Sequence, residues 1–182
     1  AHNLYRTGLI QKNNRILILQ DEMSSEVYCW QEVCHLSGAY LDIVPHPLQD
    51  GGWTEAIIDK LASDSNDGSN KIAVVCLPQA HWSDGSYVDL ITIGKLCRQH
   101  SIAFIVDATQ SAGIHPNLHV DDICCDVLAA SVHKWLLGPH GTSLMYIHPR
   151  YHDVWLPLDQ HERSRVAFQD DLYDAGINAI QY

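Results

Sequence analysis

The sequence predicts an α/β fold in which a mostly parallel sheet is flanked by helices. Apolar residues gather in short continuous runs such as Ile16–Leu19, Ile72–Leu77 and Ile102–Val106, which are typical of strands buried on both faces. Segments with apolar residues at helical spacing lie between these runs, and this alternation favours parallel strands joined by helical crossovers. The chain has 182 residues, of which 46% are hydrophobic, and this is enough for one domain with a sizeable core.

The first strand and the first long helix have clear signals. Arg15–Gln20 is expected to form the strand, because its central residues are consecutive and apolar. Ser24–Ser37 is expected to form the helix, with Ser24 or Ser25 as its N-cap and Gly38 as its C-terminal stop. A strand that leads into an amphipathic helix is the first unit of the predicted fold.

The same patterns predict the remaining elements. In chain order they are a strand at Tyr40–Val44, a helix at Trp53–Ala62, a polar loop at Ser63–Asn70, a strand at Lys71–Leu77, a helix at Leu90–His100, and strands at Ser101–Asp107, Asp126–Ala130 and Ser143–Ile147. We expect residues 1–182 to form a single, partial domain, with residues from about 151 to 182 starting a connection toward a further domain. Asp159–Arg165 is strongly charged, and within it His161–Arg165 is expected to be a solvated face.

Composition excludes several classes of function. The formal net charge of −11 disfavours nucleic acid and anionic membranes as partners, because phosphate binding needs clustered Lys and Arg. No apolar stretch approaches the length of a membrane span. The six cysteines form no CxxC pair, which favours free thiols in a reducing compartment, the cytoplasm. The 12 histidines raise the alternative of a zinc protein, but no metal-ligand spacing is present, so no metal is expected.

Three chemically rich segments follow the ends of predicted strands. They are Pro78–Gly85, Asp107–Ser111 and Ser131–Lys134. Because active sites of parallel sheets gather at the carboxyl ends of the strands, we expect these segments to meet at one edge of the sheet.

Asp107 and Lys134 match the needs of a pyridoxal phosphate site. A lysine amine forms a Schiff base with the cofactor aldehyde, and an acid keeps the pyridine nitrogen protonated. Lys134 is flanked by apolar residues and glycines, and Asp107 ends an apolar run. The alternatives are an exposed surface lysine and an aspartate that forms a turn or caps a helix.

Other polar residues are candidates for the same site. Gln110 is placed to contact the ring hydroxyl, and Ser131 and His133 are placed to donate to phosphate oxygens; a solvated turn and a strand edge are the alternatives. The loop His81-Trp82-Ser83-Asp84-Gly85 is an aromatic and polar cluster that follows a strand. It is a candidate to line a ring-shaped ligand, although a plain loop explains it equally well.

Together these segments resemble the class V aminotransferase family of pyridoxal phosphate enzymes. The resemblance rests on Asp107-Ala108-Thr109-Gln110-Ser111-Ala112-Gly113, then Ser131-Val132-His133-Lys134, then Gly138-Pro139-His140-Gly141. It extends from about Asn14 to Arg150. It implies the large domain of the fold type I transferases, incomplete here because family members are about twice this long.

The resemblance also implies roles and partners. Lys134 and Asp107 are expected to be catalytic, and Gln110, Ser131, His133, Asp84 and His81 to bind the cofactor. The implied substrate is an amino acid, processed at its α-carbon by aminotransferase, C–S lyase or epimerase-type chemistry in a homodimer.

The sequence departs from the family pattern at several points. Family members usually stack an aromatic residue or His on the cofactor ring where this chain has Met23 or Ser24. Their phosphate-binding loop precedes the region that matches Asn14, and their substrate-binding arginine and desulfurase cysteine fall beyond Tyr182. The alternative to an enzyme is therefore an inactive, truncated homologue that serves as a binding or structural module.

Overall fold

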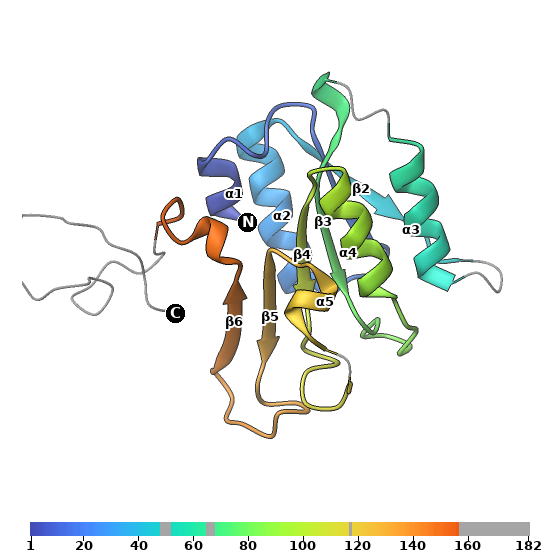
Figure 1. The fold of residues 1–182 in the computed structure, drawn as a ribbon, viewed down its shortest axis with the longest axis vertical. Coiled ribbons are helices and arrows are strands. Elements are labelled where there is room, and N and C mark those ends of the chain that lie inside the picture. Colours follow the sequence, from blue (N-terminus) through green and yellow to red (C-terminus); the bar gives the residue numbers. More distant parts are fainter. Residues whose placement is uncertain (48–51, 65–67, 117, 157–182) are drawn as a thin grey trace, which may run out of the picture.

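The computed structural model confirms the α/β fold with a mostly parallel sheet (Figure 1). The structure describes residues 1–47, 52–64, 68–116 and 118–156. Its six-stranded sheet has the order β2-β1-β3-β4-β5-β6. Neighbouring strands are parallel except for β6, which is antiparallel to β5. Strand order reverses between β1 and β3, and the strands that carry the candidate residues follow one another from β3 to β5.

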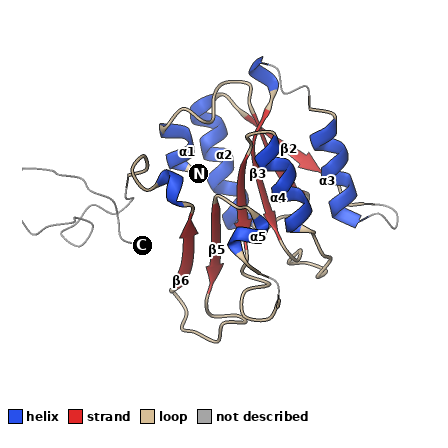
Figure 2. Cartoon of the chain, viewed as in Figure 1, coloured by secondary structure: helices blue, strands red, loops and turns tan. Residues whose placement is uncertain are grey.

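The elements agree closely with the expected ones (Figure 2). The strands are β1 (Arg15–Leu19), β2 (Tyr40–Val44), β3 (Ile72–Pro78), β4 (Ala103–Asp107), β5 (Val127–Ser131) and β6 (Ser143–Ile147). The helices are α1 (His2–Arg6), α2 (Ser24–Ser37), α3 (Gly52–Ala62), α4 (Leu90–Gln99) and α5 (Val120–Ile123), with short 3₁₀ turns at Gly68–Asn70 and Pro149–Tyr151. None of the helices in the described part of the chain has the length and apolar character needed to cross a membrane.

The prediction that Ser24 or Ser25 is the N-cap of α2 was wrong. Met23 occupies the N-cap position, and no side chain caps the helix there. The other end is as expected, because Gly38 ends α2 in the left-handed conformation at φ 74°. The short helices α1 and α5 were not predicted, since four or five residues are too few to show an apolar period.

Two hydrophobic layers cover the sheet, one on each face. Helices α3, α4 and α5 cover one face, where Trp53 and Ile93 pack against Leu77 and Val106. Helices α1 and α2 cover the other face, where Trp30 packs among residues that include Cys76. Burial of both faces explains why the central strands are apolar throughout rather than alternating.

The register of the strands places Pro78, Asp107 and Ser131 on the side of the sheet that α2 covers. Pro78 pairs with Asp107, and Asp107 pairs with Ala129. Since side chains alternate along a strand, Ser131, two residues after Ala129, points to the same side as Asp107. The carboxyl ends of β4 and β5 therefore direct Asp107 and Ser131 to the side of the sheet that α2 covers, where Pro78 ends β3.

The last described residues belong to the core. Tyr151 and Trp155 are buried, stack on each other, and pack with the residues that lie beneath α2. Tyr151 and Trp155 therefore pack as part of the core on the α2 side of the sheet. Residues 157–182, with the charged segment Asp159–Arg165, lie outside the described residues.

Candidate active site

A pocket of about 250 Å³ lies at the carboxyl ends of β3, β4 and β5. Five of the seven candidate residues line it, namely Asp107, Gln110, Ser131, His133 and Lys134. The rest of its lining comes from Glu22, Met23, Ser25, Pro78, Ala80, Trp82 and Thr109. The expected meeting of three strand-end segments at one edge of the sheet is therefore observed.

Asp107 is the last residue of β4 and is half-buried. The backbone N–H of Thr109 donates to its Oδ1 atom over 2.9 Å, so the turn that follows the strand holds the carboxylate in place. This is the turn-forming role that the sequence left open, and it does not remove Asp107 from the pocket. A carboxylate fixed by its own backbone can present its charge to a ligand without losing side-chain entropy on binding.

Lys134 lies in a tight turn that follows β5. The turn is closed by the backbone N–H of Gly138, which donates to Val132 O over 2.8 Å, and Leu137 has a positive φ of 55°. A Cβ atom at Gly138 would lie 2.6 Å from Val132 Cγ2, so only glycine allows this closure. Lys134 is half-buried and lines the pocket, in contrast to the exposed lysine that was the alternative.

Two hydrogen bonds tie the Asp107 turn to the Lys134 turn. The backbone N–H of Ser131 donates to Thr109 Oγ1 over 3.1 Å, and Trp135 Nε1 donates to Gln110 Oε1 over 3.2 Å. Gly113 lets the two turns approach, because it has φ +94° and a Cβ atom there would lie 2.8 Å from Trp135 O. The two segments form one connected wall of the pocket.

The opposite wall comes from the start of α2 and carries a buried acid. Glu22 is 8% exposed, and burial, with the nearby Glu26, raises the pKa of Glu22 to about 8. Burial also raises the pKa of Glu26 to about 7, although Cys76 Sγ–H donates to its Oε1 atom over 2.9 Å. The negative charge of Asp107 contributes to both shifts. At neutral pH Glu22 is therefore mostly protonated, and this wall adds little charge beside Asp107.

Little in the sequence indicates that Glu22 lines the pocket. Glu22 follows a strand of the same sheet, and that position was the available clue. Because a carboxyl group after a strand is common at the protein surface, that position alone does not predict a buried acid. Trp82 lies in the loop whose aromatic and polar cluster was expected to line a ring-shaped ligand, and it lines the pocket.

His81 and Asp84 are not among the residues that line this pocket. The imidazole of His81 is buried, stacks on Trp53, and has hydrogen-bond partners at both ring nitrogens. Asp84 is exposed and lies near His81 and His46. The structure thus places His81 and Asp84 next to His46, whereas Trp82 of the same loop lines the pocket.

Fold and site together define an α/β protein with a small-molecule pocket at the carboxyl edge of a parallel sheet. Comparison with known proteins identifies the family, because the model of the Aminotransferase class-V family matches residues 1–167. The chain therefore belongs to the class V aminotransferase family.

The similar proteins include cysteine desulfurases. A probable cysteine desulfurase of Pyrococcus abyssi is 28% identical over 159 residues, which are 85% of this chain and 37% of the relative. The solved structure of the cysteine desulfurase CsdA from Escherichia coli has a TM-score of 0.74 at 20% identity and aligns with 90% of this chain and 39% of its own. A cystine C–S lyase, C-DES, solved with its reaction product cysteine persulfide, has a TM-score of 0.72 at 24% identity and aligns with 88% of this chain and 44% of its own.

These coverages show that the chain spans less than half the length of the relatives it matches. At these identities, the solved structures support the fold and leave the activity to be tested.

Proposed function

We propose that the pocket binds pyridoxal 5′-phosphate and that the chain is part of an enzyme that acts on the α-carbon of an amino acid. The observation that carries the proposal is that Lys134 and Asp107 line the same pocket. A further structure of the similar lyase C-DES contains a PLP cofactor with glycine covalently linked to it. The cofactor, when bound, withdraws electrons from the α-carbon of an attached amino acid.

The donors around the pocket fit this cofactor. The Lys134 amine is the nucleophile for its aldehyde, and the Asp107 carboxylate complements a protonated ring nitrogen. Ser131 and His133, which also line the pocket, offer a hydroxyl and an imidazole for phosphate oxygens. Apolar groups of Met23, Pro78 and Ala80 line the remaining wall and suit a flat aromatic ring.

Each residue then has a defined task. Lys134 would hold the cofactor through its Nζ atom, and the same amine would serve as the base for the α-proton of the substrate. Asp107 would keep the ring nitrogen protonated, and Gln110, fixed by its bond from Trp135, would contact the ring hydroxyl. The protonated Glu22 leaves Asp107 as the dominant negative charge, which favours a cationic ring nitrogen over a neutral one.

Among the possible reactions we propose C–S bond cleavage of a sulfur-containing amino acid. The support is that several similar proteins are cysteine desulfurases or a cystine C–S lyase. None of the cysteines in the described part of the chain lines the pocket, so these residues supply no thiol to accept sulfur. Transamination and epimerisation are the competing outcomes.

We further propose a cytoplasmic homodimer. All six cysteines are free, which suits a reducing compartment. Near the pocket, Trp135 and Leu137 are 50% and 89% exposed, and Leu144 on β6 is 56% exposed. A second subunit that covers these side chains would bury apolar surface. Sedimentation of the cofactor-loaded protein tests the assembly.

The test of function is an absorbance scan of the 182-residue chain during addition of pyridoxal phosphate. We expect a visible band that Lys134→Ala abolishes and that the matched control Lys95→Ala, on the exposed side of α4, retains. Addition of cystine should then release sulfane sulfur. Formation of a keto acid without sulfur release would indicate transamination, and a D-amino acid would indicate epimerisation. A flat spectrum from a folded chain would support the inactive homologue.

A further inference from the structure

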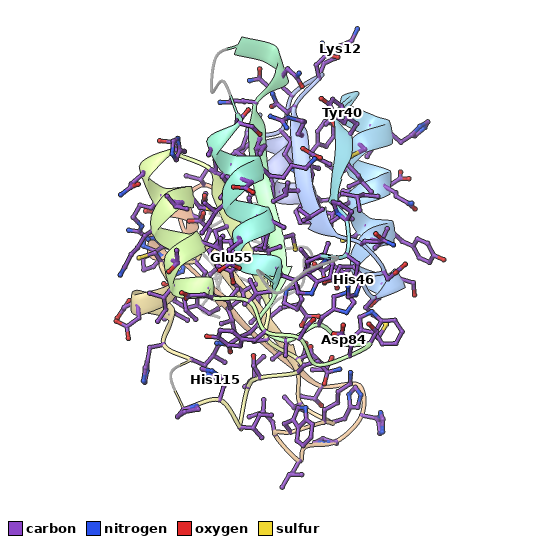
Figure 3. All side chains as sticks on the ribbon, turned by 90° about the vertical axis from the view of Figure 1, so that its right-hand side faces the viewer. Lys12, Tyr40, His46, Glu55, Asp84 and His115 are labelled. Carbon is purple, nitrogen blue, oxygen red and sulfur yellow. The ribbon has the colours of Figure 1, made fainter. Side chains whose placement is uncertain are left out.

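Three potential metal ligands meet beside the pocket, at the carboxyl ends of β1, β2 and β3. They are His46, which follows β2, and His81 and Asp84, which follow β3. One ligand atom from each lies within 4.8 Å of the other two. His46 Nε2 is 3.5 Å from Asp84 Oδ2, and His81 Nδ1 is 3.8 Å from Asp84 Oδ1. Figure 3 shows His46 and Asp84 next to each other.

Hydrogen bonding fixes the tautomer of His81 in a form that suits a metal. Its Nε2 atom is 3.0 Å from the carbonyl oxygen of Gln20. Because a carbonyl oxygen only accepts, Nε2 carries the proton and Nδ1 keeps its lone pair in the neutral ring. The Ser83 hydroxyl donates to this lone pair over 2.8 Å, and Nδ1 lies 3.8 Å from Asp84 Oδ1. Metal-binding histidines usually donate their second N–H to a carbonyl or carboxylate in this way.

The carboxylate of Asp84 is also held in orientation. Ser86 donates to Asp84 Oδ1 twice, through its backbone N–H over 2.9 Å and its hydroxyl over 2.6 Å. Oδ2 lies near the imidazole of His46 and Oδ1 near that of His81, so each imidazole has one carboxylate oxygen beside it.

Trp53 keeps the two histidine rings together. This fully buried indole stacks on His81 with 5.3 Å between ring centroids and lies 4.6 Å from the ring of His46. Its Nε1–H donates to Ser86 Oγ over 2.7 Å, the same hydroxyl that donates to Asp84. One side chain from α3 thereby supports all three potential ligands.

We propose that His46, His81 and Asp84 form a binding site for a divalent transition metal of the Zn²⁺ type. Two imidazole nitrogens and one carboxylate oxygen are a ligand set that Zn²⁺ accepts, with a fourth position for water. From Zn–ligand distances of about 2.0–2.2 Å, neighbouring ligand atoms should lie roughly 3.4 Å apart. The ligand atoms lie within 4.8 Å of one another, so they exceed this spacing by about 1.4 Å at most. His46 and Asp84, at 39% and 41% side-chain exposure, have room to close that gap.

The sequence predicted no metal because these ligands do not follow a recognisable spacing. His81 and Asp84 come from one loop and His46 from another, and only the parallel packing of β1, β2 and β3 brings them together. The bound metal would brace the loop that carries Trp82. Trp82 lines the pocket and donates from Nε1 to Asp21 O over 2.6 Å, so the metal is expected to steady one wall of the pocket.

The test is dialysis of the 182-residue chain against Zn²⁺, followed by metal analysis. We expect one tightly bound Zn²⁺ per chain. His46→Gln and Asp84→Asn should each weaken binding by more than the roughly 10- to 100-fold loss typical of outer-shell changes, whereas His35→Gln, at an exposed position on α2, should have no effect. Both substituted ligands are partly exposed, so circular dichroism of these variants should match that of the parent chain.

A second variant separates a metal site from a purely hydrogen-bonded network. Ser83→Ala removes the hydroxyl that shares His81 Nδ1, so a metal site should keep or increase its affinity for Zn²⁺. Zn²⁺ should also raise the melting temperature of the parent chain and of Ser83→Ala, but not that of Asp84→Asn. Zn²⁺ that stays bound in His46→Gln and Asp84→Asn, or a parent chain that binds none, would overturn the proposal. The measurement uses the chain without added cofactor, so its outcome is independent of the proposed catalytic function.

Discussion

The backbone N–H of Ser131 donates to the side-chain oxygen of Thr109 over 3.1 Å. This bond links the turn after β4 to the end of β5. It joins the residue two positions after Asp107 to the residue three positions before Lys134. The relative position of Asp107 and Lys134 therefore depends on how these two turns pack. Gly113 lies where the turns approach each other, since a Cβ atom there would meet Trp135 O.

Gly113→Ala should lower the stability of the chain and loosen the Lys134 turn. The new Cβ atom would meet Trp135 O at 2.8 Å in a backbone with φ +94°. We expect a loss of about 1–2 kcal/mol from the left-handed backbone and about 1–3 kcal/mol more from the clash. Urea unfolding measures the loss.

Gly8→Ala is the matched control. Gly8 has φ +75°, but nothing lies within 4 Å of the point where a Cβ atom would stand, so it should show only the backbone contribution. Equal losses for Gly113→Ala and Gly8→Ala would argue against close contact between the two turns.

Asp107→Asn should weaken binding of pyridoxal phosphate without unfolding the chain. Asparagine keeps an oxygen for the N–H of Thr109 but removes the charge opposite the ring nitrogen. A hydrogen bond to a charged group contributes about 1.5–3 kcal/mol, which corresponds to a loss of affinity of roughly 10- to 150-fold. Titration followed by absorbance gives the dissociation constant. An unchanged constant would place the ring nitrogen away from Asp107.

Glu22 should make the chain less stable as pH rises from about 5 to 8. Its pKa is about 8 in the folded chain and 4.5 as the ordinary value, so within this window the folded state holds a proton that the unfolded state has released. Folding stability then falls with increasing pH, at up to about 1.4 kcal/mol per pH unit. Below pH 4.5 both states are protonated and the effect ends.

Glu22→Gln removes this titration while keeping the shape of the side chain. We expect its urea-unfolding free energy to change less with pH than that of the parent chain across the same window. Glu26 adds a smaller effect of the same sign, because its pKa is about 7, and remains in both proteins. Parallel pH profiles for the parent and Glu22→Gln would show that Glu22 is ionised in the folded chain at neutral pH.

Much of the fold was predictable because the central strands are buried on both faces. Their apolar runs and the intervening helical patterns led to the right elements, and the rule that sites gather at strand ends predicted the meeting of Asp107, Ser131 and Lys134. Short elements such as α1 and α5 carry too few residues for a periodic signal. The N-cap of α2 was missed because the serines that resemble caps are already inside the helix.

The site was less predictable where it depends on packing between distant segments. Glu22 forms part of the pocket only because α2 starts against the ends of β3 and β4. His81 was expected to bind the cofactor, yet its burial against Trp53 directs it to His46 and Asp84. Local sequence gives the residue types in a loop, whereas the side that each residue faces is decided by the elements around it.

Reduction of the cofactor-loaded chain with borohydride, followed by peptide mass analysis, tests the central claim most directly. Reduction makes the bond between a lysine and the cofactor permanent, so the modified residue can be located among the five lysines, Lys12, Lys60, Lys71, Lys95 and Lys134. The account predicts one phosphopyridoxyl group per chain, on Lys134, and loss of that label in Lys134→Ala. A label distributed over the other lysines, or none at all on a folded chain, would contradict it.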